Sequence, residues 1–141
     1  MRFNLMIAVA AISVLGSGLA QAATLTFTAT LKGADEVPAT DSAGTGAVKA
    51  TLDTTTKTLS YTATYSGLTG PALAAHFHGP AAPGANAPPT VPVISVSSPI
   101  TGTATLTDAQ IADLEAGKWY FNVHTAAHKG GEIRGQVVPT N

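Results

Sequence analysis

The sequence predicts an all-β fold, an antiparallel Greek-key β-sandwich of about eight strands with one short helix. Apolar and polar residues alternate at period two in several short segments, as they do in strands that bury one face. Clusters of Gly, Pro, Asp and Ser separate these segments at the short spacing typical of sandwiches. Charged residues make up only 11% of the chain, and Thr is abundant, which favours a β scaffold over a charged helical one.

The N-terminus has the three parts of a secretory signal peptide, predicted to span residues 1–22. A positive start at Arg2 precedes an apolar run over 5–15 and a small-residue stretch that ends at Ala22, after which we expect cleavage. The protein is therefore predicted to be periplasmic or secreted. The alternative is an uncleaved membrane anchor, but the apolar run is shorter than the about 20 residues that a membrane span needs.

The remaining 119 residues, 23–141, are expected to form one domain. They carry six Lys or Arg against eight Asp or Glu, and no basic stripe that would indicate nucleic-acid binding. The chain has no cysteine, so disulfides and thiolate metal ligands are excluded. Any metal chemistry must rely on histidines and carboxylates.

Period-two alternation predicts three strands in the first half of the domain, over 24–31, 48–52 and 59–66, with a turn at 53–57. In the second half we expect strands at 72–78, 93–97, 102–106, 118–124 and 132–138. The segment 79–92 is rich in Gly and Pro and is expected to resist regular structure.

One short helix is predicted before the 118–124 strand. Thr107 is a good N-cap, and Gln110 completes a Thr-x-x-Gln capping box. Ile111 and Leu114 share one face, and Gly117 stands where a helix C-terminus favours glycine.

The domain has four histidines, in the pairs His76 with His78 and His124 with His128. Residues i and i+2 of a strand point to the same face, so His76 and His78 can aim at one point. Because Phe77 is apolar and should face the core, both histidines are expected on the outer face. The same alternation places Tyr120, Asn122 and His124 outward in the later strand.

If these two strands lie side by side, three imidazoles converge, and His128 could supply a fourth. Imidazole suits copper and zinc, and also nickel and iron. We therefore predict a metal site, most readily for copper with zinc as the alternative. The competing interpretation is four scattered surface histidines, since histidine is at home on wet faces.

Glu132 and Arg134 follow in the last predicted strand, after the Gly130-Gly131 turn. One interpretation is that they belong to an exposed cross-strand ion pair, worth less than about 1 kcal/mol. The other makes Arg134 a cation beside the metal that attracts a small anion.

Three segments, 31–38 (LKGADEVP), 75–81 (AHFHGPA) and 122–125 (NVHT) followed by 130–136 (GGEIRGQ), resemble the CHRD domain, named from chordin. They occur in the order of that family, and the resemblance covers essentially all of the domain. CHRD domains occur in bacterial exported proteins and in an animal growth-factor antagonist, so the resemblance does not by itself imply one biochemical activity.

A more distant similarity, to Cu/Zn superoxide dismutase, rests on the order of its motifs: an H-x-H strand, a later Val-His strand, and then an arginine that guides superoxide to copper. The similarity implies copper ligation by His76, His78 and His124, with Arg134 as the catalytic guide. No histidine lies between His78 and His124 to bridge to zinc, and no cysteine can form that family's disulfide. The similarity therefore implies a copper-only site.

Two functions remain open at this point. The first is an exported copper protein, either a carrier or an oxidoreductase that dismutates superoxide, with a metal ion and a small anion as its partners. The second is a non-catalytic extracytoplasmic binding or matrix module that uses the Pro-rich segment and exposed strand edges. A hydrolase is disfavoured, because Asp35, Glu36 and Asp41 cluster in a loop and no Gly-x-Ser-x-Gly motif is present.

Overall fold

The structure is a computed structural model that describes residues 22–140. The predicted signal peptide lies outside these residues, apart from its last position. The elements in chain order are β1 (Thr24–Lys32), a 3₁₀ turn (Gly33–Asp35), β2 (Thr45–Asp53), β3 (Thr58–Ser66), β4 (Ala72–His78), β5 (Pro89–Pro92), β6 (Ile100–Thr105), α1 (Asp108–Glu115), β7 (Trp119–Thr125) and β8 (Ile133–Thr140).

The eight strands form one antiparallel sheet in the order β5-β4-β7-β8-β1-β2-β3-β6. Neighbours in the chain pair as hairpins in β1–β2, β2–β3, β4–β5 and β7–β8. The other connections cross between the two halves of the sheet, as Greek-key folds require. The predicted all-β class with one short helix is confirmed.

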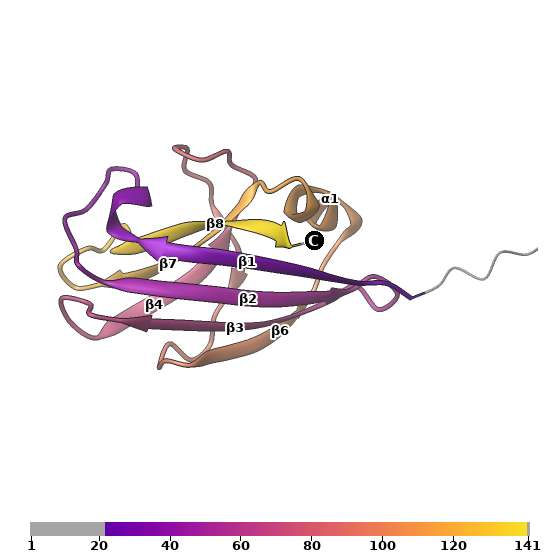
Figure 1. Ribbon diagram of the computed structural model, residues 1–141, viewed down its shortest axis with the longest axis horizontal. Coiled ribbons are helices and arrows are strands. Elements are labelled where there is room, and N and C mark those ends of the chain that lie inside the picture. Colours follow the sequence, from indigo (N-terminus) through magenta and orange to yellow (C-terminus); the bar gives the residue numbers. More distant parts are fainter. Residues whose placement is uncertain (1–21, 141) are drawn as a thin grey trace, which may run out of the picture.

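The sheet is continuous, but it curls until its two halves face each other. Figure 1 shows β1, β2 and β3 in front and β4 and β7 crossing behind them. The rings of Tyr61 in β3 and Phe77 in β4 are 5.0 Å apart, although four strands separate β3 from β4 in the sheet order. The predicted inward residues fill the space between the halves, among them Leu31, Phe77 and Trp119, all fully buried. The core therefore resembles that of a sandwich, while the hydrogen bonding is that of one nearly closed sheet.

One strand was predicted in the wrong place. The residues 93–97 form no strand, and the fifth strand lies instead at Pro89–Pro92, inside the segment expected to be irregular. The strand is short and pairs only with β4 among the described strands, so it is an edge strand of the sheet. Proline is tolerated at such an edge because its missing N–H is not needed for a ladder.

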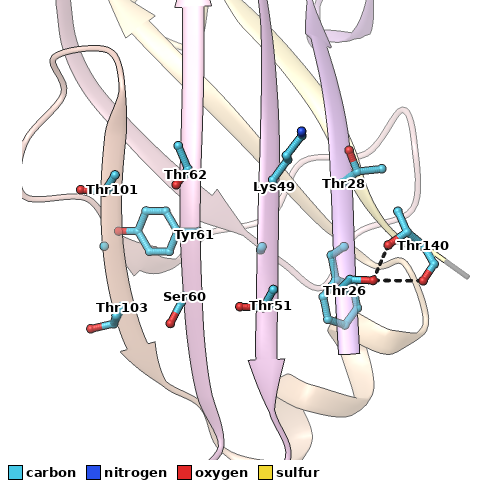
Figure 2. Close-up of a pocket in the computed structure, with 13 residues that line it drawn as sticks. Thr26, Thr28, Lys49, Thr51, Ser60, Tyr61, Thr62, Thr101, Thr103 and Thr140 are labelled. Carbon is cyan, nitrogen blue, oxygen red and sulfur yellow. Dashed lines mark hydrogen bonds between the residues drawn. The ribbon is translucent and has the colours of Figure 1, made fainter. Parts of the chain in front are cut away.

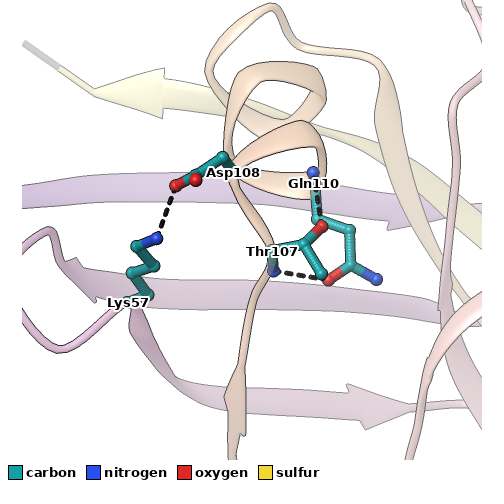
Figure 3. Close-up of polar contacts among 4 residues, drawn as sticks. All are labelled: Lys57, Thr107, Asp108 and Gln110. Carbon is teal, nitrogen blue, oxygen red and sulfur yellow. Dashed lines mark hydrogen bonds and ion pairs between the residues drawn. The ribbon is translucent and has the colours of Figure 1, made fainter.

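The helix begins and ends as its sequence predicts. Thr107 accepts a hydrogen bond from the Gln110 backbone N–H, and the Gln110 side chain accepts one from the Thr107 N–H, so the capping box is complete (Figure 3). Leu114 is buried, and Gly117 has a φ of +69°, in the left-handed region that favours glycine. Among the described residues, no helix is long and apolar enough to cross a membrane.

Candidate metal centre

Strands β4 and β7 bring the histidines of two distant segments together. They pair antiparallel, with His76 opposite Asn122 and Ala74 opposite His124. Phe77 and Phe121 point into the core, so the alternating residues His76 and His124 lie on the opposite face of the sheet. The condition for convergence, that the two strands lie side by side, is met, and the predicted outward direction is confirmed.

The three histidines form a compact group. His76 Nδ1 lies 3.2 Å from His124 Nε2, and the ring centroids of His76 and His78 are 5.4 Å apart. One nitrogen from each ring can be chosen so that all three atoms lie within 4.8 Å of one another. These three histidines could hold a metal ion.

Backbone carbonyls fix the tautomers of two of these rings. His78 Nδ1 lies 2.9 Å from the Ala87 carbonyl oxygen, and His124 Nδ1 lies 2.8 Å from the Lys129 carbonyl oxygen. A carbonyl oxygen only accepts hydrogen bonds, so each Nδ1 must carry the proton and donate it. Each Nε2 then presents a lone pair, which is the form in which imidazole ligates a metal.

The surroundings of His76 and His78 favour neutral imidazoles. Burial lowers the pKa of His76, and the neighbouring His124 and His78 lower it further. Burial also lowers the pKa of His78, against the hydrogen bonds to Ala87 and Asn122, which raise it. Neutral rings are the ones that can bind a cation.

The sequence pattern indicates a solvent-exposed outer face for β4, β7 and β8. The structure instead covers the part of this face around His78, Tyr120 and Asn122. The segment 79–88 packs over it, so that His78, Tyr120 and Asn122 are 7%, 2% and 2% exposed. The Tyr120 hydroxyl donates to the Ala87 carbonyl and accepts from the Ala87 N–H. The Pro-rich segment is therefore bound to the domain and does not project as a free recognition loop.

Arg134 lies under the same segment, on the polar face beside Asn122. Its guanidinium donates to Asn86 Oδ1 at 2.8 Å and to the Ala85 carbonyl, and it stacks 3.4 Å above the centre of the Tyr120 ring. Tyr120 in turn stacks on His78 with parallel rings 4.7 Å apart. Arg134 is thus joined to the histidine group through one intervening ring.

Glu132 does not form the exposed ion pair with Arg134 that was one interpretation of the sequence. It is fully buried, and its carboxylate accepts from the Ser42, Thr69 and Thr125 hydroxyls and from the Thr69 N–H. These hydrogen bonds hold the pKa of Glu132 at about 2, although burial alone would raise it. Glu132 therefore ties together three segments that are far apart in the chain.

The structure does not bring His128 into the histidine group. Its side chain lines a separate pocket of about 410 Å³ together with Glu36 and Asp41. Its backbone N–H donates to the Thr125 carbonyl, and its carbonyl accepts from Gly131, so the backbone here forms a tight turn.

Two residues of the site were missed as functional candidates. Glu36 was placed in a loop without a partner, but it is 5% exposed and lies beside Asn122 and Arg134. Burial raises its pKa to about 7, against the lowering effect of Arg134. Asn122 was assigned to the correct face, and its Oδ1 lies 3.0 Å from His78 Nε2. Their presence in the segments 31–38 and 122–125, which carry the family resemblance, was the available signal.

Comparison with known proteins places this site within a family. A family model described as the CHRD domain matches residues 27–137. No curated protein and no solved structure matches the chain. The three segments that resemble the family contribute Glu36, the histidines of β4, and Asn122 with Arg134, and these residues meet on one face of the sheet. The chain belongs to the CHRD domain family.

Proposed function

We propose that this protein is an exported metal-binding domain that holds one ion, most readily copper, between His76, His78 and His124. The observation that carries the proposal is the pair of carbonyl contacts at His78 and His124, which leave both Nε2 atoms as lone-pair donors. In metal sites, a ligating histidine commonly donates its other N–H to a backbone carbonyl or carboxylate. Scattered surface histidines have no need of this arrangement.

The spacing of the donor atoms supports the same proposal. Atoms bound at 2.0–2.2 Å to one ion, at angles between a right angle and a tetrahedral angle, are roughly 2.8–3.6 Å apart. His76 Nδ1 and His124 Nε2, 3.2 Å apart, fall within that range. One nitrogen of His78 lies within 4.8 Å of one nitrogen of each of the other two rings, so the third imidazole is close enough to be a ligand of the same ion.

Copper is favoured over zinc by the predicted export and by the distant similarity to superoxide dismutase, and imidazole suits both ions. His76 and His124 are only half-buried, which leaves the solvent side of the group open to a small anion. A redox-active ion there would support dismutation, in which two superoxide anions and two protons give dioxygen and hydrogen peroxide. Arg134, which is 2% exposed and stacks on Tyr120, would contribute positive charge from the buried side of the group.

Metal binding is tested with the mature chain, residues 23–141, by competition against a chelator for Cu(II) and Zn(II). We expect one ion per chain, and loss of binding in the His76→Ala, His78→Ala double variant. His128→Ala is the matched control, because its ring lies outside the group, and it should bind like the unaltered chain. Absence of binding to either ion would remove the proposal.

A superoxide assay on the copper-loaded chain then separates a carrier from an enzyme. If the protein is an enzyme, dismutation should exceed that of the double variant, and Arg134→Ala should lower the rate while copper remains bound. Turnover equal to that of the double variant would leave the carrier function alone.

A non-catalytic binding module is the second candidate, and a different part of the molecule favours it. The outer face of β1, β2, β3 and β6 contains a hollow of about 910 Å³ lined mainly by hydroxyl side chains. Figure 2 shows that the outward side chains form two rows across the strands. One row contains Thr26, Thr51, Ser60 and Thr103, and the other contains Thr28, Thr62 and Thr101 together with Lys49. Hydroxyl donors and acceptors suit a ligand such as a polysaccharide. The test compares how well an insoluble polysaccharide retains the unaltered chain and the Thr51→Lys variant. Retention of the unaltered chain that is lost in the variant would support this function. Equal retention of the two proteins would contradict it.

A further inference from the structure

Asn122 lies beside the histidine group of the candidate metal centre. It lies in β7 directly opposite His76 on one side and Arg134 on the other, and it is 2% exposed. Its side chain is therefore on the same face of the sheet as that of His76, a proposed ligand, and next to it on the neighbouring strand. Its Oδ1 lies 3.0 Å from His78 Nε2, the nitrogen proposed to bind the metal.

The contact between Asn122 and His78 joins two acceptors. His78 donates its Nδ1–H to the Ala87 carbonyl, so Nε2 of the neutral ring has a lone pair. Asn122 Oδ1 is also an acceptor. With a neutral His78 ring, neither of these two atoms can donate to the other, so the 3.0 Å contact has no hydrogen atom between them.

The surroundings of Asn122 hold its carboxamide in this orientation. Its Nδ2 lies 3.4 Å from the Gly130 carbonyl oxygen and faces the Glu36 carboxyl. Rotating the carboxamide by half a turn would direct Oδ1 at the Gly130 carbonyl oxygen, which can only accept. The Gly130 carbonyl therefore acts as a positioning group that keeps Oδ1 directed at His78.

We infer that Asn122 Oδ1 is a fourth ligand to the metal, which completes a three-nitrogen, one-oxygen donor set with His76, His78 and His124. A cation shared by His78 Nε2 and Asn122 Oδ1 turns the acceptor–acceptor contact into two coordinate bonds. Their 3.0 Å separation is within the roughly 2.8–3.6 Å expected of two ligands on one ion. The inference rests on the proposed function and replaces His128 as the source of the fourth donor.

This donor set also bears on the choice of metal. It contains neither a thiolate nor a thioether, the ligands that suit Cu(I). Three imidazoles with a carbonyl-type oxygen suit Cu(II) and Zn(II) better. The site is therefore expected to bind Cu(II) more tightly than it binds Cu(I).

Two variants of the mature chain test the inference, with Cu(II) and Zn(II) as probes. Asn122→Leu keeps the approximate shape and removes the donor, whereas Asn122→Asp keeps an oxygen in place and adds charge. We expect Asn122→Leu to weaken Zn(II) binding by at least about tenfold. Asn122→Asp should retain binding and should shift the g∥ value of the Cu(II) electron paramagnetic resonance spectrum. Gln136→Leu is the matched control, since the Gln136 carboxamide bonds to the Ala81 and Gly117 carbonyls instead.

The outcomes separate this inference from the proposed function. Unchanged affinity in Asn122→Leu, or an unchanged Cu(II) spectrum in Asn122→Asp, overturns the oxygen ligand while leaving the histidine site intact. If Asn122→Leu does not fold, as its melting curve without metal would reveal, the spectrum of Asn122→Asp decides alone. Failure of the unaltered chain to bind either ion would remove both the site and this ligand.

Discussion

Glu132 is a carboxylate that the fold keeps ionised although it is fully buried. Three hydroxyls and one backbone N–H donate to it, and they hold its pKa at about 2, below its usual 4.5. A carboxyl whose pKa is lower in the folded state stabilises the fold above its unfolded pKa and loses that contribution as the pH falls. Glu132 should therefore contribute on the order of 3 kcal/mol at neutral pH, which declines between about pH 4.5 and pH 2.

Replacing Glu132 with Gln tests this contribution. The variant should unfold more easily at pH 7, and the difference from the unaltered chain should shrink as the pH falls toward 2. Denaturant unfolding at a series of pH values measures both effects. A difference that stays constant across this range would contradict the account.

Glu36 should respond to pH in the opposite direction. Burial raises its pKa to about 7, so the folded chain binds a proton that the unfolded chain releases above about pH 4.5. Its contribution therefore becomes less favourable as the pH rises from 4.5 to 7. Glu36→Gln should gain stability relative to the unaltered chain between pH 5 and pH 8, as read from melting temperatures. Asp35→Asn, which removes a carboxylate at an exposed neighbouring position, is the control.

At the residue scale, the sequence predicts which side chains share a face and does not predict how deeply that face is buried. Period-two alternation places His76, His124 and Arg134 correctly. The burial of Glu36 and Glu132 depends on loops that fold back from distant parts of the chain. Alternation carries no information about such loops, because they have no fixed period.

Among the elements, α1 shows what local sequence specifies by itself. Its capping box is complete, and an ion pair joins Lys57 to Asp108 with 2.7 Å between Nζ and Oδ1 (Figure 3). The cap satisfies a backbone N–H at the helix start, whereas the ion pair is largely exposed to solvent. The cap should therefore contribute more to stability.

Thr107→Ala and Lys57→Met measure this difference. Removing the cap should lower the free energy of unfolding by about 1 kcal/mol. Removing the ion pair should change it by less than about 1 kcal/mol, and by less still at high salt. Equal losses in the two variants would contradict this ranking.

The segment 79–88 is the element whose position depends most on tertiary contacts. Arg134 donates to Ala85 and Asn86, and the Ala87 carbonyl of the same segment fixes the His78 tautomer.

Arg134→Lys keeps the charge but loses the planar fork that donates to both partners. We expect faster amide hydrogen exchange at Gly79, whose N–H bonds to the Pro88 carbonyl. Lys32→Met, in register with Arg134 on the neighbouring strand, is the control. Unchanged exchange in Arg134→Lys would exclude this role of the guanidinium.

The fifth strand shows where prediction of an element fails. The β-branched residues of 93–97 favour a strand there, and the prolines of 89–92 argue against one. The sheet nevertheless ends at Pro89–Pro92, because the antiparallel pairing with β4 brings these residues into place. An edge position, which only the tertiary structure reveals, makes the prolines acceptable.

On the scale of the whole molecule, the junction of β8 with β1 joins the two halves of the sheet. Gly135 lies there at a close approach, where an added Cβ would stand 2.0 Å from the Thr30 carbonyl oxygen. Backbone cannot move aside as a flexible side chain can. Gly135→Ala should therefore cost about 3 kcal/mol or more. Gly130→Ala has open space around its added Cβ and should change stability by less than about 0.5 kcal/mol. Similar unfolding curves for the two variants would contradict the tight junction.

The whole-molecule architecture was predictable in class and less so in connectivity. Alternation and turn spacing predict eight antiparallel strands with an apolar interior, and the structure has both. Whether that interior lies between two separate sheets or inside one curled sheet depends on the pairing of β1 with β8, the first and last strands. Such long-range pairing leaves no mark on local periodicity.

The most direct measurement of the metal site is a crystal structure of residues 23–141 loaded with copper or zinc, with anomalous scattering recorded at the absorption edge of the metal. The account predicts one strong peak per chain, within bonding distance of His78 Nε2, His124 Nε2 and His76 Nδ1. A peak in the pocket of His128 and Asp41, or no ordered peak in a crystal soaked with excess metal, would contradict it.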